Sequence, residues 1–219
     1  HKPIFKGSED FVGQIIHPQE WNSTIDYENK KVAVIGSGAT AITLIPEIAK
    51  KASHVTMIQR SPTYIASVPS KYKILHLLNY ISPKLGYKII RFTNILRQRR
   101  IYRRAMRSPE LVKNYLLDLV RDELPGFDIE KHFTPTYNPW EQRLCLAPDS
   151  DFFESINQKR VSVETETIDS FSEKGVQLDS GKLIEADIII TATGIKLQNF
   201  GGIRIFVDEN EIDISKSFI

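Results

Sequence analysis

A glycine-rich turn is the part of the sequence whose chemistry can be read most directly. An apolar run at residues 32–35 is followed by Gly36, Ser37, Gly38, Ala39 and Thr40, with a third small residue at Ala41. In such a strand–turn–helix, the first glycine permits a tight turn and the second lets the backbone approach a pyrophosphate without a Cβ in the way. The free N–H groups at the start of the helix then face the anion. The sequence therefore predicts a dinucleotide site at residues 36–41.

The end of the next predicted strand indicates which dinucleotide this turn would hold. An NAD site usually carries a carboxylate about 20 residues after the glycines, where it binds the ribose 2′-hydroxyl. Here the strand at 54–59 is followed by Arg60 and Ser61, with no carboxylate. A guanidinium matches the 2′-phosphate of NADPH with a planar fork of donors. A solvated surface arginine is the alternative, but the location favours NADPH over NADH.

A second segment precedes the turn and gives it a family context. Phe11, Gly13, His17 and Trp21 have the spacing F-x-G-x-x-x-H-x-x-x-W. With the glycine turn close behind, this order resembles the Baeyer–Villiger branch of the flavin-dependent monooxygenases, although Asn22 stands where that family usually has proline. The resemblance implies that these four residues lie at a hinge between an FAD-binding and an NADPH-binding domain. Direct acid–base work by His17 is the less favoured interpretation.

The same resemblance assigns roles to two later pairs of residues. Gln142 and Arg143 match a family pair that places the arginine beside the flavin, as the catalytic cation, and its partner near a cofactor phosphate. A fixed guanidinium could stabilise a C4a-peroxyflavin anion and its adduct with the substrate. From the residues alone, a structural arginine that binds loop carbonyls is as good an interpretation. Thr193 and Gly194 resemble a small-residue turn of many flavoproteins with two dinucleotide domains, where the chain crosses back towards the FAD domain. Glycine after a strand is also ordinary turn chemistry.

The periodicity predicts an α/β fold with a Rossmann-like parallel sheet and a mainly helical insertion. Strands are expected at 31–36, 54–59, 161–167 and 186–192, a helix at 41–51, a hairpin at 171–178 and a further strand pattern at 207–214. Residues 71–125 have helical spacing, for example at Leu85, Phe92, Leu111 and Tyr115, and prolines 83 and 109 divide them into about three helices.

The expected domain organisation is that of a piece of a longer enzyme. Residues 1–30 would hold the fingerprint and linker from an absent FAD-binding domain. Residues 31–199 would form the NADPH-binding domain, with the helical insertion at 71–125. Residues 200–219 would begin the return to the FAD-binding domain.

Composition restricts the remaining possibilities. The chain has 219 residues, a net charge of +2 and one cysteine, Cys145, which predicts packing, a reducing cytoplasm and no redox pair. No apolar run reaches the ~20 residues of a membrane span, and His54, His76 and His132 lack metal-ligand spacing. The arginine cluster at 97–107 is interpreted as a solvated helix face, in preference to a membrane contact or a nucleic-acid contact. Oligomeric state stays open.

The resemblance implies an NADPH-dependent FAD monooxygenase that inserts one oxygen atom from O2 into a ketone or sulfide. The piece alone would lack turnover, because its FAD site is not encoded. Alternatives are an N- or S-oxidising flavin monooxygenase, an NADPH-sensing module and a pyridine-nucleotide disulfide reductase. The single Cys145 counts against the last of these.

Overall fold

A five-stranded parallel sheet forms the centre of the molecule, and the α/β prediction is confirmed. The computed structural model describes residues 3–22, 24–70, 82–195, 201 and 203–212. The strand order is β1-β10-β2-β3-β6. These strands are β1 (Gln14–Ile16), β10 (Ile188–Thr191), β2 (Lys31–Ile35), β3 (His54–Gln59) and β6 (Val161–Thr165), and each pairs in parallel with its neighbours.

The apolar run predicted at 186–192 forms β10, between β1 and β2, and all of its residues are buried. Ile188 and Ile190 face one hydrophobic cluster, and Ile189 faces another. Because both faces of β10 are covered by core, side chains on either face must be apolar. This explains why its sequence is continuously apolar and does not alternate between apolar and polar residues.

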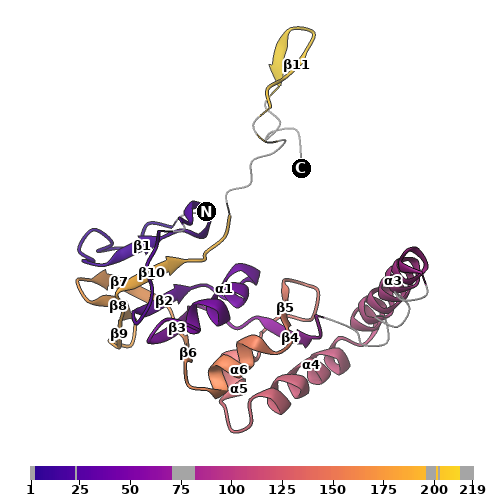
Figure 1. Ribbon diagram of the computed structural model, residues 1–219, viewed down its shortest axis with the longest axis horizontal. Coiled ribbons are helices and arrows are strands. Elements are labelled where there is room, and N and C mark those ends of the chain that lie inside the picture. The colour runs from indigo at the N-terminus through magenta and orange to yellow at the C-terminus, as the bar shows by residue number, and fades with distance from the viewer. Residues whose placement is uncertain (1–2, 23, 71–81, 196–200, 202, 213–219) are drawn as a thin grey trace.

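Different elements cover the two faces of the sheet (Figure 1). Helices pack on one face, namely α1 (Ala39–Ala49), α5 (Ile129–Phe133) and α6 (Asp151–Asn157). An antiparallel sheet covers the other, made of β7 (Ile168–Ser172), β8 (Gly175–Leu178) and β9 (Leu183–Glu185). The hairpin predicted at 171–178 is thus confirmed. Helix α1 begins two residues before the predicted start at residue 41 and retains Pro46 within it.

A separate two-stranded parallel sheet joins β4 (Tyr64–Val68) to β5 (Leu144–Pro148). Two long helices, α3 (Pro83–Arg107) and α4 (Pro109–Glu123), lie between these strands in the sequence, and the short α5 follows them. Proline occupies the first position of each long helix, where its missing N–H costs no hydrogen bond. The sequence thus placed these helix starts correctly, and the predicted helical stretch at 71–81 lies outside the described residues.

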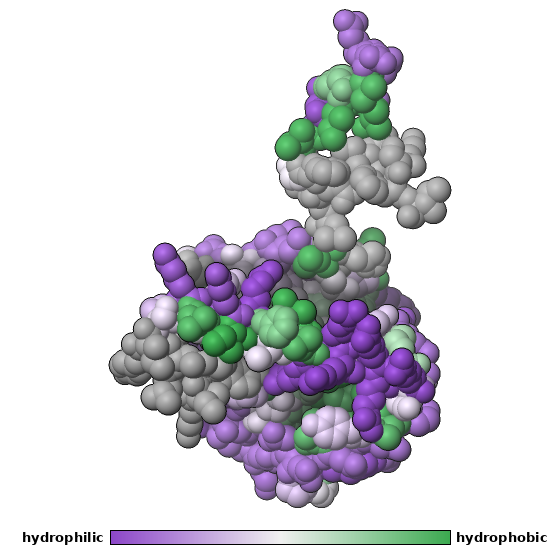
Figure 2. Space-filling model, turned by 90° about the vertical axis from the view of Figure 1, so that its right-hand side faces the viewer, coloured by the Kyte–Doolittle hydropathy of each residue, from purple (hydrophilic) through white to green (hydrophobic). Residues whose placement is uncertain are grey.

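The predicted apolar face of this helical segment is mostly not a buried face. Leu85, Phe92, Leu111 and Tyr115 are each about half exposed or more. The buried residues of α4 are instead Val112, Leu116, Leu117 and Val120. Hydrophobic and hydrophilic side chains lie next to one another on the side of the molecule where α3 lies (Figure 2). The arginines at 97–107 are exposed.

The prediction of one strand at 207–214 was wrong. The described residues form a hairpin of β11 (Ile205–Val207) and β12 (Asn210–Ile212), and residues 213–214 lie outside the described part. Asp208 and Glu209 both have positive φ, 48° and 65°, which makes the tight turn between the strands. The alternation of apolar and polar residues continues across a short turn. The pattern alone therefore did not reveal that the chain reverses direction between β11 and β12. Among the described helices, none is long and apolar enough to cross a membrane.

Candidate nucleotide-binding site

The predicted glycine turn joins β2 to α1, and its first glycine is required by the fold. Gly36 has φ +123°, and a Cβ there would lie 2.4 Å from the carbonyl oxygen of Ala192. Its N–H donates to the carbonyl oxygen of Ile58 at 2.8 Å. The turn is therefore pressed between β10 and β3, where a side chain would collide with backbone.

The second glycine is not required by the fold. Gly38 is the N-cap residue of α1, with φ −80° and ψ 179°, which any residue can adopt. A Cβ added at Gly38 would meet nothing within 4 Å. The open space lies at the start of an 11-residue helix whose first turn holds no acidic residue and whose N-cap makes no side-chain hydrogen bond. The unpaired N–H groups at such a helix start can bind an anion.

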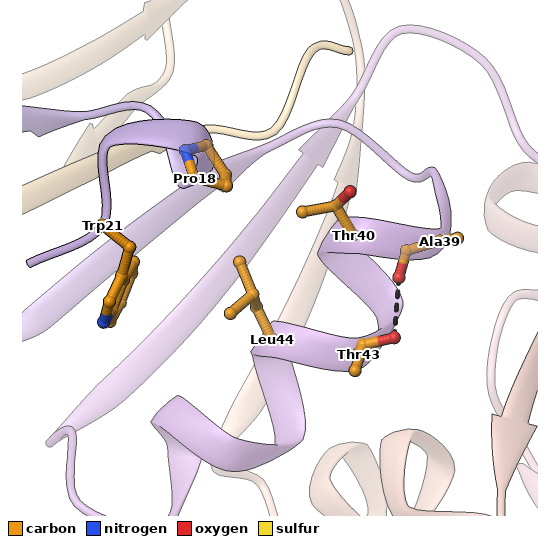
Figure 3. A pocket seen from close by; sticks show the side chains of 6 residues that line it. All are labelled: Pro18, Trp21, Ala39, Thr40, Thr43 and Leu44. Carbon is orange, nitrogen blue, oxygen red and sulfur yellow. Dashed lines mark hydrogen bonds between the residues drawn. The ribbon is translucent and has the colours of Figure 1, made fainter. Parts of the chain in front are cut away.

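A cleft of about 500 Å³ lies beside this helix start (Figure 3). Its walls come from the fingerprint segment, which contains the short helix η1 (Pro18–Glu20), and from the first half of α1. The lining residues are Pro18, Trp21, Ala39, Thr40, Thr43 and Leu44. The predicted fingerprint residue Trp21 and the predicted turn residues Ala39 and Thr40 thus share one surface.

The fingerprint histidine links two predicted segments that are far apart in the sequence. The buried His17 ring accepts a hydrogen bond from the N–H of Gln19 at Nδ1, 3.3 Å away. Its other nitrogen, Nε2, lies 3.0 Å from the carbonyl oxygen of Gly194. Because Nδ1 accepts, the proton sits on Nε2, which donates to Gly194. Both ring nitrogens are used structurally, which fits the positioning interpretation better than acid–base work.

Phe11 and Gly13 also have clear packing roles. The Phe11 ring is buried in the cluster between the central sheet and β7–β9. A Cβ at Gly13 would lie 2.2 Å from the carbonyl oxygen of Asp187 and 2.6 Å from the Phe11 ring. The glycine therefore lets the chain pass under the aromatic side chain as it enters β1.

Two hydrogen-bonded side chains, those of Ser37 and Thr63, connect the glycine turn to Arg143. The buried hydroxyls of Ser37 and Thr63 lie 3.2 Å apart. Arg143 donates from Nε to the Thr63 hydroxyl at 3.0 Å. The structure thus brings the predicted Arg143 to the predicted turn, through a residue that the sequence analysis did not identify. No spacing signal singles out Thr63, because its partners lie 26 and 80 positions away.

The backbone at Arg143 is held by a pair of tyrosines. Tyr137 donates its hydroxyl to the carbonyl oxygen of Arg143 at 3.1 Å. Tyr64 donates to the carbonyl oxygen of Tyr137 at 2.7 Å, and their rings meet edge to face. Burial raises the pKa of Tyr64 to about 12, so this donor keeps its proton at neutral pH.

The remaining predicted residues divide by exposure. Arg60, Ser61 and Gln142 are exposed. Within the part of the chain that the structure describes, Arg60 has no hydrogen bond or ion pair and follows the carboxyl end of β3. Cys145 is buried 3.7 Å from the carbonyl oxygen of Ser37, and burial raises the pKa of its thiol. The packing role predicted for Cys145 is confirmed.

Comparison with known proteins places this arrangement in a family. The model of the flavin-binding monooxygenase-like family matches residues 1–129. The FAD-containing monooxygenase EthA of Mycobacterium tuberculosis is 49% identical over 218 residues, which cover 98% of this chain and 45% of EthA. The probable FAD-binding monooxygenase AlmA of Acinetobacter baylyi is 48% identical, over 100% of this chain and 44% of AlmA. The chain thus spans less than half the length of these relatives.

Solved structures show the same fold at lower identity. A steroid monooxygenase bound to NADP matches with a TM-score of 0.70 and 20% identity, over 89% of this chain and 44% of that one. An open form of cyclohexanone monooxygenase matches with a TM-score of 0.66 and 20% identity, over 89% of this chain and 45% of that one. With the family match over residues 1–129, more than half of its length, the chain belongs to the flavin-binding monooxygenase-like family.

Proposed function

We propose that this chain is the NADPH-binding portion of an FAD-dependent monooxygenase. In this proposal the whole enzyme inserts one oxygen atom from O2 into a ketone or sulfide, as a Baeyer–Villiger enzyme does. Relatives named FAD-containing monooxygenase and similar structures crystallised with FAD and NADP support it. The observation that carries it is the glycine turn, where Gly36 is fixed by packing and Gly38 leaves open space at a helix start.

The turn fits the pyrophosphate of a dinucleotide. The space that a Cβ of Gly38 would fill is available to a phosphate oxygen, and the first N–H groups of α1 supply donors. Ala39 and Thr40 are exposed there, so the first turn of α1 is accessible from solvent. The buried Ser37 hydroxyl points to Thr63, so this side chain contacts the protein interior and not the open space beside Gly38.

The preference for NADPH rests on Arg60. It follows β3, and β3 lies beside β2, whose carboxyl end carries the glycine turn. The carboxyl ends of parallel strands meet at one edge of a sheet, so Arg60 and the exposed Ser61 can reach a 2′-phosphate on the adenosine ribose. Among the described residues the Arg60 guanidinium has no hydrogen-bond or ion-pair partner, and its exposed position makes it available for that contact.

Arg143 is the proposed catalytic cation, with Gln142 near a cofactor phosphate. When bound, the flavin would supply the oxygen-activating chemistry, with reducing equivalents from NADPH. A guanidinium is a planar, delocalised cation with several N–H donors, which suits it to stabilising negative charge on a bound group. Its link to the turn through Thr63 would hold this cation near the nucleotide.

The His17–Gly194 hydrogen bond supports the proposed hinge. It ties the fingerprint to the turn after β10, so the entry to and exit from residues 31–199 move together. The proposed domain division places residues 1–30 and 200–219 as the two connections to an FAD-binding domain, and the first of these connections contributes β1 to the central sheet. A cytoplasmic location belongs to the same proposal, and the reduced, buried Cys145 is compatible with it.

Titration with NADP⁺ and NAD⁺ tests the proposal. The chain should bind NADP⁺ at least tenfold more tightly than NAD⁺, and Arg60→Ala should remove most of that preference, as expected for one charge-assisted contact. Equal affinity for both nucleotides would refute the NADPH assignment. Assays of the full-length protein with a ketone, a sulfide and a tertiary amine would identify the substrate class, and amine oxidation alone would favour the N-oxidising alternative.

A further inference from the structure

We propose that Thr63 is a positioning residue that fixes the Arg143 guanidinium relative to the glycine turn. Through this contact, nucleotide binding at the turn and the orientation of the cation would depend on each other. The inference rests on the proposed function, because the nucleotide is the ligand that would sense the link. Three observations carry it, namely the burial of Thr63, the direction of its hydrogen bonds and the register of the strands that hold it.

Thr63 can form this link rigidly because its side chain is almost fully buried. Its exposed fraction is 1%, and that of Ser37 is 3%. Water therefore cannot replace either hydroxyl readily, and the branched Cβ of threonine restricts rotation about χ1. A buried hydroxyl that loses its partner costs free energy, so the Ser37–Thr63 contact resists breaking.

The chemistry of the donor groups sets the direction of the hydrogen bonds that run from Arg143 through Thr63 to Ser37. The Nε–H of Arg143 can only donate, so the Thr63 oxygen accepts from it at 3.0 Å. The hydroxyl proton of Thr63 is then available to Ser37, 3.2 Å away. Donation from the guanidinium makes the Thr63 hydroxyl a better donor in turn, because hydrogen bonds in series polarise one another. The positive charge of Arg143 is thereby coupled to the turn.

Strand pairing places the two partners side by side. Thr63 immediately precedes β4 and Arg143 immediately precedes β5, and the next residues, Tyr64 and Leu144, are partners in the parallel ladder. Tyr137 holds the backbone of Arg143. Within the described ranges, the contact with Thr63 is the one hydrogen bond of the Arg143 guanidinium itself. Loss of the Thr63 hydroxyl would therefore free the cation while its backbone stays in place.

A double-mutant cycle tests whether Thr63 acts through Arg143. The variants are Thr63→Val, Arg143→Ala and the two combined, each titrated with NADP⁺. We expect T63V to weaken NADP⁺ binding about three- to tenfold, as for one charge-assisted hydrogen bond. We expect R143A to weaken it at least as much, and T63V to add nothing in the R143A background.

Two control variants separate positioning from loss of stability. Thr63→Ser keeps the hydroxyl and should restore NADP⁺ affinity. Thr56→Val removes another buried threonine hydroxyl, one that contacts Ser162, and should leave NADP⁺ affinity unchanged. If T63V does not fold, the double variant Ser37→Ala/Thr63→Val takes its place in the cycle. This variant also removes the Ser37 hydroxyl, which T63V would leave without its Thr63 partner. Additive effects of T63V and R143A, or failure of T63S to restore affinity, would overturn the inference. A wild-type chain that does not bind NADP⁺ would overturn the proposed function as well.

Discussion

Alanine substitution at the two glycines of the turn should have opposite consequences, because one glycine serves the fold and the other the ligand. At Gly36 an added Cβ would lie 2.4 Å from the Ala192 oxygen, at a φ of +123°. The backbone must shift by several tenths of an ångström to relieve that contact. Overpacking of this kind costs about 1–3 kcal/mol, and a left-handed backbone adds about 1–2 kcal/mol for alanine.

The expected loss of stability in Gly36→Ala is therefore roughly 2–5 kcal/mol. For a domain of this size, that corresponds to a fall in Tm of about 4–20 °C. At Gly38 the added Cβ meets nothing within 4 Å and φ is −80°. Alanine is a poorer N-cap than glycine, but it also restricts the unfolded chain, so these effects offset to within about 1 kcal/mol.

Thermal unfolding and NADP⁺ titration of the two variants form the assay. Gly38→Ala should unfold within a few degrees of the wild type, about what 1 kcal/mol allows, yet bind NADP⁺ at least tenfold more weakly, because the methyl group occupies the phosphate position. Gly36→Ala should lose stability before any ligand is added. Wild-type NADP⁺ affinity in Gly38→Ala would refute our placement of the pyrophosphate.

Three further predictions concern buried titratable side chains. His17→Ala should destabilise the fold by roughly 1–3 kcal/mol in urea unfolding, because Gln19 and Gly194 lose their buried partner; unchanged stability would argue against the link. Cys145 should react with a thiol reagent far more slowly in the native chain than in denaturant, because burial raises the pKa of its thiol; equal rates would contradict its burial. Burial lowers the pKa of His132, so the unfolded chain binds a proton there first as pH falls below about 6.5. Wild-type stability should therefore decrease on acidification more steeply than that of His132→Gln, and parallel pH profiles would exclude this contribution.

The features that sequence analysis predicted correctly are those in which neighbouring residues determine the outcome. The run at 32–35 followed by two glycines predicts a strand and a turn, because burial and backbone freedom are both local there. The prolines at 83 and 109 mark helix starts for the same reason. The fingerprint and the glycine turn were linked in the sequence only as a family signature, and the structure adds that Trp21 and Thr40 line one cleft.

The features that sequence analysis missed depend on contacts between distant segments. Helical periodicity at Leu111 and Tyr115 is real, but which side of α4 is buried depends on β4 and α3, and the buried side holds Val112 and Leu116. The β11–β12 hairpin was missed because Asp208 and Glu209 adopt a left-handed turn without glycine or asparagine at those positions. Thr63 was missed because nothing local marks it.

The helical segment between β4 and β5 has a structural purpose that the term insertion does not convey. Parallel strands cannot be joined by a tight turn and need a long crossover connection. Residues 69–143 provide that connection, and α3 and α4 pack back on β4 through Ala105, Val112 and Leu116. The crossover returns the chain to β4 in the register that sets Arg143 beside Thr63. Changes in the packing of these helices should therefore reach the glycine turn through the Thr63–Arg143 contact and through Cys145 of β5, which contacts Ser37. Among the described residues that line the cleft, none belongs to α3 or α4.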